Sequence, residues 1–172
     1  MHDKKSENYL SWEEYFMATA FIAAKRSKDP ETQVGAVIVG KNKKIVGIGY
    51  NGMPRGCDDD EMPWGKHNEN PLDNKGMYVV HAEMNAIANK NCESLEDFTL
   101  YCTLFPCHNC AQMIIQQGIK EVVYFEDRPE KESMKASRNL FNICKIKLRE
   151  WKRPNKQLHL DFLTGKCFLE KE

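Results

Sequence analysis

Two short motifs, His81-Ala82-Glu83 and Pro106-Cys107-His108-Asn109-Cys110, constrain the fold of this chain more than any other feature. Cysteines three apart on a helix share one face, so Cys107 and Cys110 can bind one metal ion, to which His81 must come from another element. Three such ligands suit zinc and leave its fourth tetrahedral position open for water. The chain must therefore fold so that two elements distant in sequence meet at one zinc site.

Glu83, two residues after His81, indicates whether this zinc site is structural or catalytic. A Cys-x-x-Cys pair alone could be a redox motif, two packed side chains or half of a structural zinc site, and Glu83 alone could be an exposed residue near a helix start. The complete order, His-x-Glu followed by Pro-Cys-x-x-Cys, is the zinc-deaminase pattern. We therefore predict one catalytic Zn²⁺ bound by His81, Cys107 and Cys110, with Glu83 as the general acid and base.

Composition and charge indicate one domain acting on a small substrate. We assign residues 1–172 to a single deaminase domain with a flexible N-terminus at 1–10. Equal numbers of basic and acidic side chains give a formal net charge of zero, which disfavours a nucleic-acid partner. The N-terminus is polar, and no apolar run is long enough to span a membrane. We therefore expect a cytoplasmic protein with reduced thiols. Cys57 and His67 could begin a second metal site, but nothing defines its other ligands.

The first expected helix spans residues 11–27 and is amphipathic. Ser11 can cap it, and Glu14 completes a capping box three residues later. The apolar residues with helical spacing are Tyr15, Phe16, Ala18, Thr19, Ile22 and Ala23. We expect this stripe to face the core.

The remaining pattern predicts an α/β fold with three layers, in which a central mixed β-sheet is flanked by helices. An antiparallel hairpin precedes a long loop at 51–80, which is rich in Gly, Pro, Asn and Asp and has the length of a functional loop. Further helices are expected at 81–89, 107–117 and 132–142, and strands at 34–39, 44–49, 98–104, 122–125, 146–149 and 157–162.

Two residues outside the zinc motifs are candidates for contact with substrate. Phe105 could form a wall of a base pocket, although an aromatic residue at a strand end is as often part of the core. Asn51 ends the second strand, so its amide could reach a substrate hydroxyl or could equally make local turn hydrogen bonds. The residues alone leave both alternatives open.

Beyond the zinc motifs, several longer runs resemble the cytidine/deoxycytidylate deaminase superfamily, and its deoxycytidylate deaminases in particular. These runs cover most of the chain and are Arg26-Ser27-Lys28-Asp29-Pro30, Gln33-Val34-Gly35-Ala36, Ile45-Val46-Gly47-Ile48-Gly49-Tyr50-Asn51-Gly52-Met53-Pro54, His81-Ala82-Glu83-Met84-Asn85-Ala86-Ile87 and Leu104-Phe105-Pro106-Cys107. The resemblance implies zinc-dependent hydrolysis of dCMP to dUMP and ammonia, which supplies thymidylate synthesis. It also implies the layered deaminase fold, a homo-oligomer and control by dCTP and dTTP.

The resemblance also implies roles for individual residues. Asn51 would contact the sugar, and the loop at Gly52, Met53 and Pro54 would border the effector region. Lys90 takes about the position of a basic residue that binds the substrate phosphate, with Lys28 and Arg26 as further candidates. The implied substrate-binding residues are therefore Asn51, Ala82, Phe105 and Lys90.

Two competing functions use the same motifs. A deaminase of cytidine, deoxycytidine or tRNA adenosine would share the zinc machinery, but the long loop at 51–80 and the neutral charge favour a nucleotide. A zinc-stabilised interaction module without catalysis would have no use for Glu83 beside an open metal position.

Overall fold

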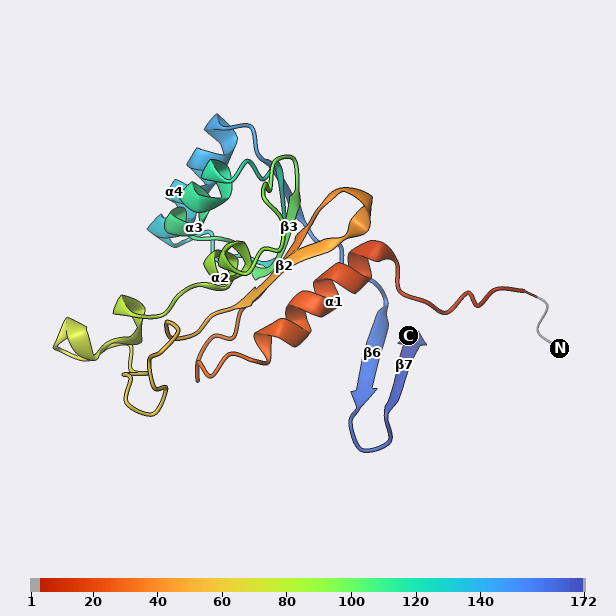
Figure 1. Ribbon diagram of the computed structural model, residues 1–172, viewed down its shortest axis with the longest axis horizontal. Coiled ribbons are helices and arrows are strands. Elements are labelled where there is room, and N and C mark those ends of the chain that lie inside the picture. The colour runs from red at the N-terminus through yellow and green to blue at the C-terminus, as the bar shows by residue number, and fades with distance from the viewer. Residues whose placement is uncertain (1–3, 172) are drawn as a thin grey trace.

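The computed structural model describes residues 4–171, and a five-stranded mixed sheet forms its centre (Figure 1). The strand order is β2-β1-β3-β4-β5, in which β1 is antiparallel to both β2 and β3, and β3, β4 and β5 are parallel. The strands are β1 (Gly35–Val39), β2 (Ile45–Tyr50), β3 (Thr99–Leu104), β4 (Glu121–Glu126) and β5 (Lys147–Glu150). This confirms the predicted mixed sheet and its antiparallel first hairpin.

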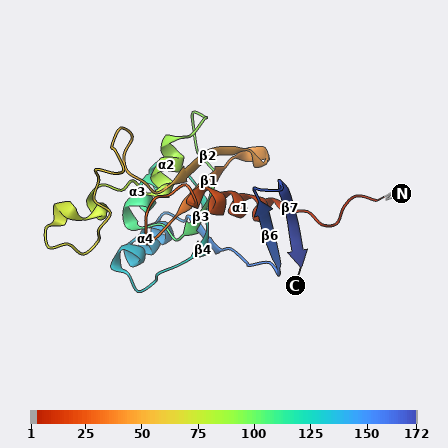
Figure 2. The same cartoon turned by 90° about the horizontal axis from the view of Figure 1, so that it is seen from below.

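Helices cover both faces of the sheet, as Figures 1 and 2 show. Alternate residues of a strand point to opposite faces, so Ala36 and Ile38 of β1 pack against one helical layer and Val37 and Val39 against the other. The first layer holds α2 (Ala82–Ala88), α3 (His108–Gln116) and α4 (Glu132–Ile143), and the second is α1 (Trp12–Ala24). The predicted three-layer fold is therefore confirmed.

Helix α1 begins as predicted and buries part of the predicted stripe, including Phe16 and Ala23. Ser11 and Glu14 form the capping box, whereas Tyr15 and Ile22 are exposed. The reason is the sheet beneath the helix: a Cβ on Gly35 would lie 1.9 Å from the carbonyl oxygen of Ala20, so the helix backbone rests directly on β1. The small side chains of Ala20 and Ala24 allow this close approach. The helix also buries Phe16, Met17 and Ala23.

Helix α2 lies equally close to β2. A Cβ on Gly49 would lie 2.2 Å from the carbonyl oxygen of Ala82 and 2.3 Å from the amide nitrogen of Ala86. The glycine therefore sets the position of α2, and with it the position of His81 at the N-cap of this helix.

The long segment between β2 and α2 is built from turns. Its ends are joined by a bridge between Gly52 and Val80, and it contains single-turn 3-10 helices at Pro71–Asp73 and Lys75–Met77. The segment predicted as a long loop therefore has a defined path, which brings Lys75 into a buried position.

The C-terminal region forms a separate hairpin of β6 (Lys156–Asp161) and β7 (Lys166–Lys171), seen beside α1 in Figures 1 and 2. Strand β7 was not predicted. The carboxylate of Asp161 accepts hydrogen bonds from the amides of Leu163 and Thr164, a turn signal that the sequence contains.

The N-terminus was predicted to be flexible over residues 1–10. Residues 1–3 lie outside the described residues, and the side chain of Asn8 donates a hydrogen bond to the carbonyl of Leu169. Within residues 4–171, no helix combines the length and hydrophobicity needed to cross a bilayer.

Candidate active site

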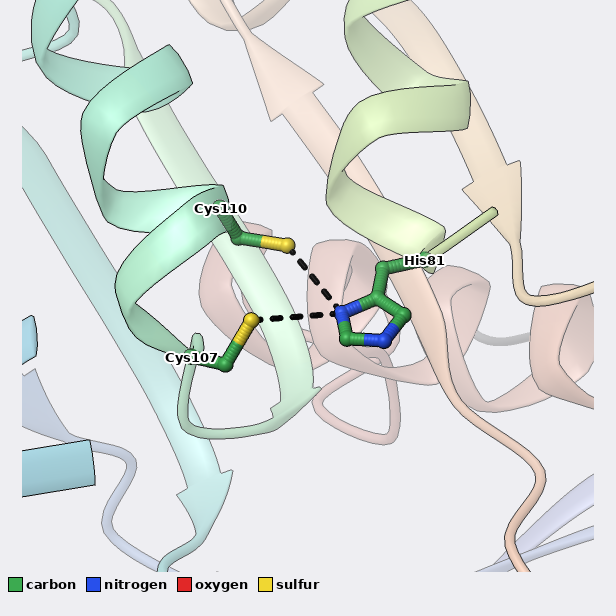
Figure 3. A group of neighbouring side chains, drawn as sticks. All are labelled: His81, Cys107 and Cys110. Atoms are coloured by element: carbon green, nitrogen blue, oxygen red, sulfur yellow. Dashed lines mark hydrogen bonds between the residues drawn. The ribbon is translucent and has the colours of Figure 1, made fainter. Parts of the chain in front are cut away.

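His81, Cys107 and Cys110 come together at the starts of α2 and α3 (Figure 3). The Nδ1 atom of His81 lies 3.3 Å from the sulfur of Cys107 and 3.3 Å from that of Cys110, and all three ligand atoms lie within 4.8 Å of one another. A tetrahedral zinc with usual bond lengths separates its nitrogen and sulfur ligands by about 3.5 Å. The three side chains therefore fit a zinc ion.

The chain path explains why the ligands converge. Strand β3 leads through Phe105 and Pro106 to Cys107, which is the N-cap of α3, and Cys110 lies in the first turn of that helix. The parallel pair of β3 and β4 places α3 beside α2 in the same layer. Both helices point their amino ends at the ligands, where the positive dipole ends stabilise thiolates.

The three ligands share protons when no cation is bound. Hydrogen bonds from Cys110 and, less strongly, from His81 outweigh burial and lower the pKa of Cys107 to about 3. The hydrogen bond to Cys107 raises the pKa of His81 to about 8, whereas the same thiolate and burial raise the pKa of Cys110. A dication at this position would displace the remaining protons, so the arrangement is suited to metal binding.

Glu83 lies beside the ligands without belonging to their set. Its side chain is buried, with only 4% of the residue exposed, and it lines the same cavity as His81 and Cys107. Burial raises the pKa of its carboxyl, and the nearby charge of His81 only partly opposes that effect. A carboxyl whose pKa lies nearer to neutral pH can both accept and donate a proton there, so it is suited to general acid and base catalysis.

A cavity of about 250 Å³ opens beside the ligands, large enough for a small molecule. Three of the four predicted substrate residues line it: Asn51, Ala82 and Phe105. Phe105 is also a fully buried core residue that packs edge-on against Tyr124, and its role as a wall of a base pocket stays a prediction.

The structure does not bring Lys90 to this cavity. It follows the carboxyl end of α2, so a rise of 1.5 Å per residue places it about 10 Å along the helix from Glu83. The further candidate Lys28 instead pairs with Asp59, and Arg26 lies over the ring of Tyr50. Gly52, Met53 and Pro54 are half-buried outside the cavity lining, and their effector role stays a prediction.

Four basic residues in the cavity lining were not predicted. Lys66 and Lys75 come from the long segment after β2, and Arg128 and Lys131 come from the connection between β4 and α4. Lys66 pairs with Glu31 and Lys75 pairs with Asp29, whereas neither Arg128 nor Lys131 makes an ion pair with the described part of the chain. The sequence offered one signal for Arg128 and Lys131: both follow the strand β4, which lies beside the strand that leads into the cysteine-bearing helix α3.

Within residues 4–171, the three ligands form the only cluster of three or more side chains arranged to hold a metal ion. Cys57 is exposed and is not part of such a cluster, and neither is His67. The structure therefore does not support a second site built from these two residues.

Comparison with known proteins agrees with the site. The geometry is that of a zinc-dependent deaminase. The chain belongs to the cytidine and deoxycytidylate deaminase family, because residues 10–126 match the model of its zinc-binding region. Zinc is accordingly the metal of this site.

Within this family, the chain is similar to proteins named as deoxycytidylate or dCMP deaminases. Human deoxycytidylate deaminase is 51% identical over 160 residues, which cover 92% of this chain and 90% of the human protein. A probable deoxycytidylate deaminase of Drosophila melanogaster is 48% identical over 166 residues, covering 93% and 82%. The structure of dCMP deaminase from the cyanophage S-TIM5 in complex with dCMP and dUMP matches with a TM-score of 0.64 at 28% identity, covering 83% of this chain and 100% of that one.

Proposed function

We propose that the protein hydrolyses dCMP to dUMP and ammonia. The observation that carries this proposal is the buried Glu83, which lines a cavity of about 250 Å³ beside three zinc ligands and is not needed to hold the metal. The human and cyanophage relatives named as deoxycytidylate or dCMP deaminases support the choice of substrate.

His81, Cys107 and Cys110 would hold the zinc, which when bound lowers the pKa of a coordinated water molecule so that it can attack the base. Glu83 would take a proton from the attacking water and deliver it to N3 of the cytosine ring as the new C–O bond forms at C4. It would then pass the second proton to the exocyclic nitrogen, so that the C4–N4 bond breaks and neutral ammonia leaves. The products balance as dUMP and ammonia from dCMP and water.

The cavity walls would orient the base and the sugar. Phe105 packs edge-on against Tyr124 and Phe141, with ring centroids at 4.9 and 6.0 Å, and would form a fixed part of the wall beside the base. Ala82, next to Glu83 in the chain, contributes a small side chain to the lining. Asn51 can accept a hydrogen bond from a sugar hydroxyl through Oδ1, which uses one lone pair on the amide of Val34.

The substrate phosphate would bind to Arg128 and Lys131. Both line the cavity and neither has a carboxylate partner within residues 4–171, so both remain available to an anion. Lys66 also lines the cavity, but its pairing with Glu31 at 2.9 Å makes it a weaker candidate. Arg128 can form two parallel hydrogen bonds with a phosphate, whereas Lys131 supplies a point charge.

Ammonia release by the zinc-loaded protein from dCMP, deoxycytidine, CMP and dCTP, measured in parallel, tests this proposal. We expect dCMP to have the highest kcat/KM, because only it has both the deoxyribose and one phosphate. Equal kcat/KM for deoxycytidine and dCMP would remove the nucleotide assignment. No ammonia from any of the four would leave tRNA adenosine deamination or a zinc-stabilised interaction module.

We further propose that dCTP and dTTP act at Gly52–Pro54 and that the protein is a homo-oligomer. Gly52 and Val80 exchange two backbone hydrogen bonds of 3.1 and 2.9 Å, and Val80 precedes His81, so a ligand at this loop would be one residue from the zinc site. Exposed apolar side chains on the C-terminal hairpin, including Leu160 and Phe168, support assembly. Light scattering and kinetics with and without dCTP test both ideas.

A further inference from the structure

The segment before β1 is tied to the long segment after β2 by ion pairs. Lys28 pairs with Asp59, Glu31 pairs with Lys66, and Asp29 pairs with Lys75. The first two pairs are largely exposed, and exposed pairs contribute little because water screens them. Only the third is buried, with side-chain exposures of 9% for Lys75 and 5% for Asp29.

The buried pair is connected to the backbone on both sides. Asp29 Oδ1 accepts hydrogen bonds from Lys75 Nζ at 2.6 Å and from the amides of Glu31 and Thr32 at 2.8 and 2.9 Å. The backbone amide of Lys75 donates to the carbonyl of Gly65 at 2.8 Å. This pair is therefore the one best shielded from water among the ion pairs that join two segments separated by β1 and β2.

The same carboxylate also contacts Asn51. The Asn51 Nδ2 atom donates to the Thr32 carbonyl at 2.9 Å and more weakly to Asp29 Oδ2 at 3.4 Å, and Oδ1 accepts from the amide of Val34 at 2.8 Å. Both amide hydrogens are therefore committed to the segment that contains Asp29. The backbone of Thr32 and Val34 therefore sets the orientation of Asn51, and Asp29 contributes a weaker direct contact and holds the amide of Thr32 in place.

All three side chains line the cavity that contains Glu83. None of them is within the zinc ligand cluster of His81, Cys107 and Cys110. Their arrangement thus bears on where a substrate lies and not on how the metal is held.

We propose that Asp29 and Lys75 are positioning residues that fix Asn51 and the neighbouring wall of the cavity before the substrate binds. The inference rests on the proposed hydrolysis of dCMP. Removing Lys75 would leave the buried charge of Asp29 without a cation, and removing Asp29 would leave Lys75 with only its longer contact of 3.5 Å to Glu31. In either case the segment containing Lys75 would shift until water reached the remaining charge. The wall would then have to be rebuilt on each binding event, which weakens substrate binding while Glu83 stays in place.

The test compares zinc-loaded variants with the wild-type protein. Lys75→Met removes the charge at similar length, Lys75→Arg retains it, and Asp59→Asn is the matched control because it breaks an exposed ion pair between the same two segments. We expect Lys75→Met to raise KM for dCMP roughly 10- to 100-fold, the cost of displacing a binding group by about 1 Å, with kcat within about threefold of wild type. Lys75→Arg should recover most of the KM change, and Asp59→Asn should have a wild-type KM.

A double variant keeps the proposal testable if Lys75→Met does not fold. Asp29→Asn with Lys75→Met leaves no unpaired charge, so it should fold and bind zinc, because replacing a buried ion pair by neutral groups is often tolerated. We expect its KM to stay raised. A folded Lys75→Met protein with wild-type KM, or a double variant that regains wild-type KM, would overturn the positioning role.

A second readout separates this inference from the proposed function. Backbone hydrogen exchange of residues 65–80 in the zinc-loaded protein without substrate should become faster in Lys75→Met and remain unchanged in Asp59→Asn. A wild-type protein that is inactive on dCMP would contradict the proposed function. Unchanged hydrogen exchange in Lys75→Met would instead show that the ion pair of Asp29 and Lys75 does not hold this segment in place.

Discussion

Arg128 and Lys131 provide the sharpest prediction about substrate choice. Replacing each by a neutral residue of similar length, Arg128→Gln and Lys131→Gln, should reduce activity on dCMP and leave activity on deoxycytidine unchanged. The reason is that a deoxynucleoside has no phosphate for either side chain to bind, while the zinc ligands and Glu83 act on the base in both substrates.

The size of the effect follows from the exposure of the two cations. Arg128 is half-buried and makes no ion pair with residues 4–171, so a phosphate would meet an already accessible guanidinium. A hydrogen bond to a charged group contributes about 1.5–3 kcal/mol, or roughly a 10- to 150-fold change in kcat/KM. Lys131 is exposed, so water and salt screen its charge and we expect only about a 3- to 10-fold loss.

The assay measures kcat/KM for dCMP and deoxycytidine at two salt concentrations, together with inhibition by dUMP and by deoxyuridine. The dCMP preference should fall in both variants, more in Arg128→Gln, and inhibition by dUMP should weaken while inhibition by deoxyuridine stays constant. Equal losses with both substrates would refute the phosphate assignment, because they would show damage to the shared base site.

Three further outcomes follow from the same structure. Gly49→Ala should lower both the Tm and the zinc content, measured by calorimetry and metal analysis, because its new Cβ would lie 2.2 Å from the carbonyl oxygen of Ala82 and push α2 away. Chelator competition should show apparent zinc affinity rising with pH between about 6 and 8, because protons on His81 and the thiols must leave when the metal binds. Burial raises the pKa of Asp29, but hydrogen bonds from its lysine partner and from backbone amides outweigh this and hold it below the usual 3.8. The stabilisation by this carboxylate is thus present above pH 3.8 and lost as the pH falls through the folded-state pKa, so Asp29→Asn should flatten the acid limb of stability in urea titrations.

Local signals in the sequence were sufficient for most of the fold. The capping box at Ser11 and Glu14, the alternating strands and the two metal motifs each depend on neighbouring residues, and each lies where it was predicted. The predicted core stripe of α1 was wrong at Tyr15 and Ile22, which are exposed, because the buried face depends on a glycine of another element, Gly35, which helical periodicity does not report. Strand β7 was missed although the Asp161 turn before it could have indicated a hairpin.

The site divides in the same way. The zinc ligands were predictable because they occur as two compact motifs with fixed spacing. The pair of Asp29 and Lys75 joins residues 46 positions apart, and its burial depends on how the segment after β2 folds back. Lys90 was a reasonable candidate by position along the chain, but the direction of α2 carries it away from the cavity.

The central claim is that Glu83 transfers protons in a zinc-dependent deamination of dCMP. Its most direct test is the rate of dUMP formation by wild-type and Glu83→Gln proteins that have been shown to contain equal zinc. We predict that the variant keeps its zinc and its fold and loses roughly two to four orders of magnitude in kcat. A Glu83→Gln protein with equal zinc and a kcat close to wild type would contradict the account.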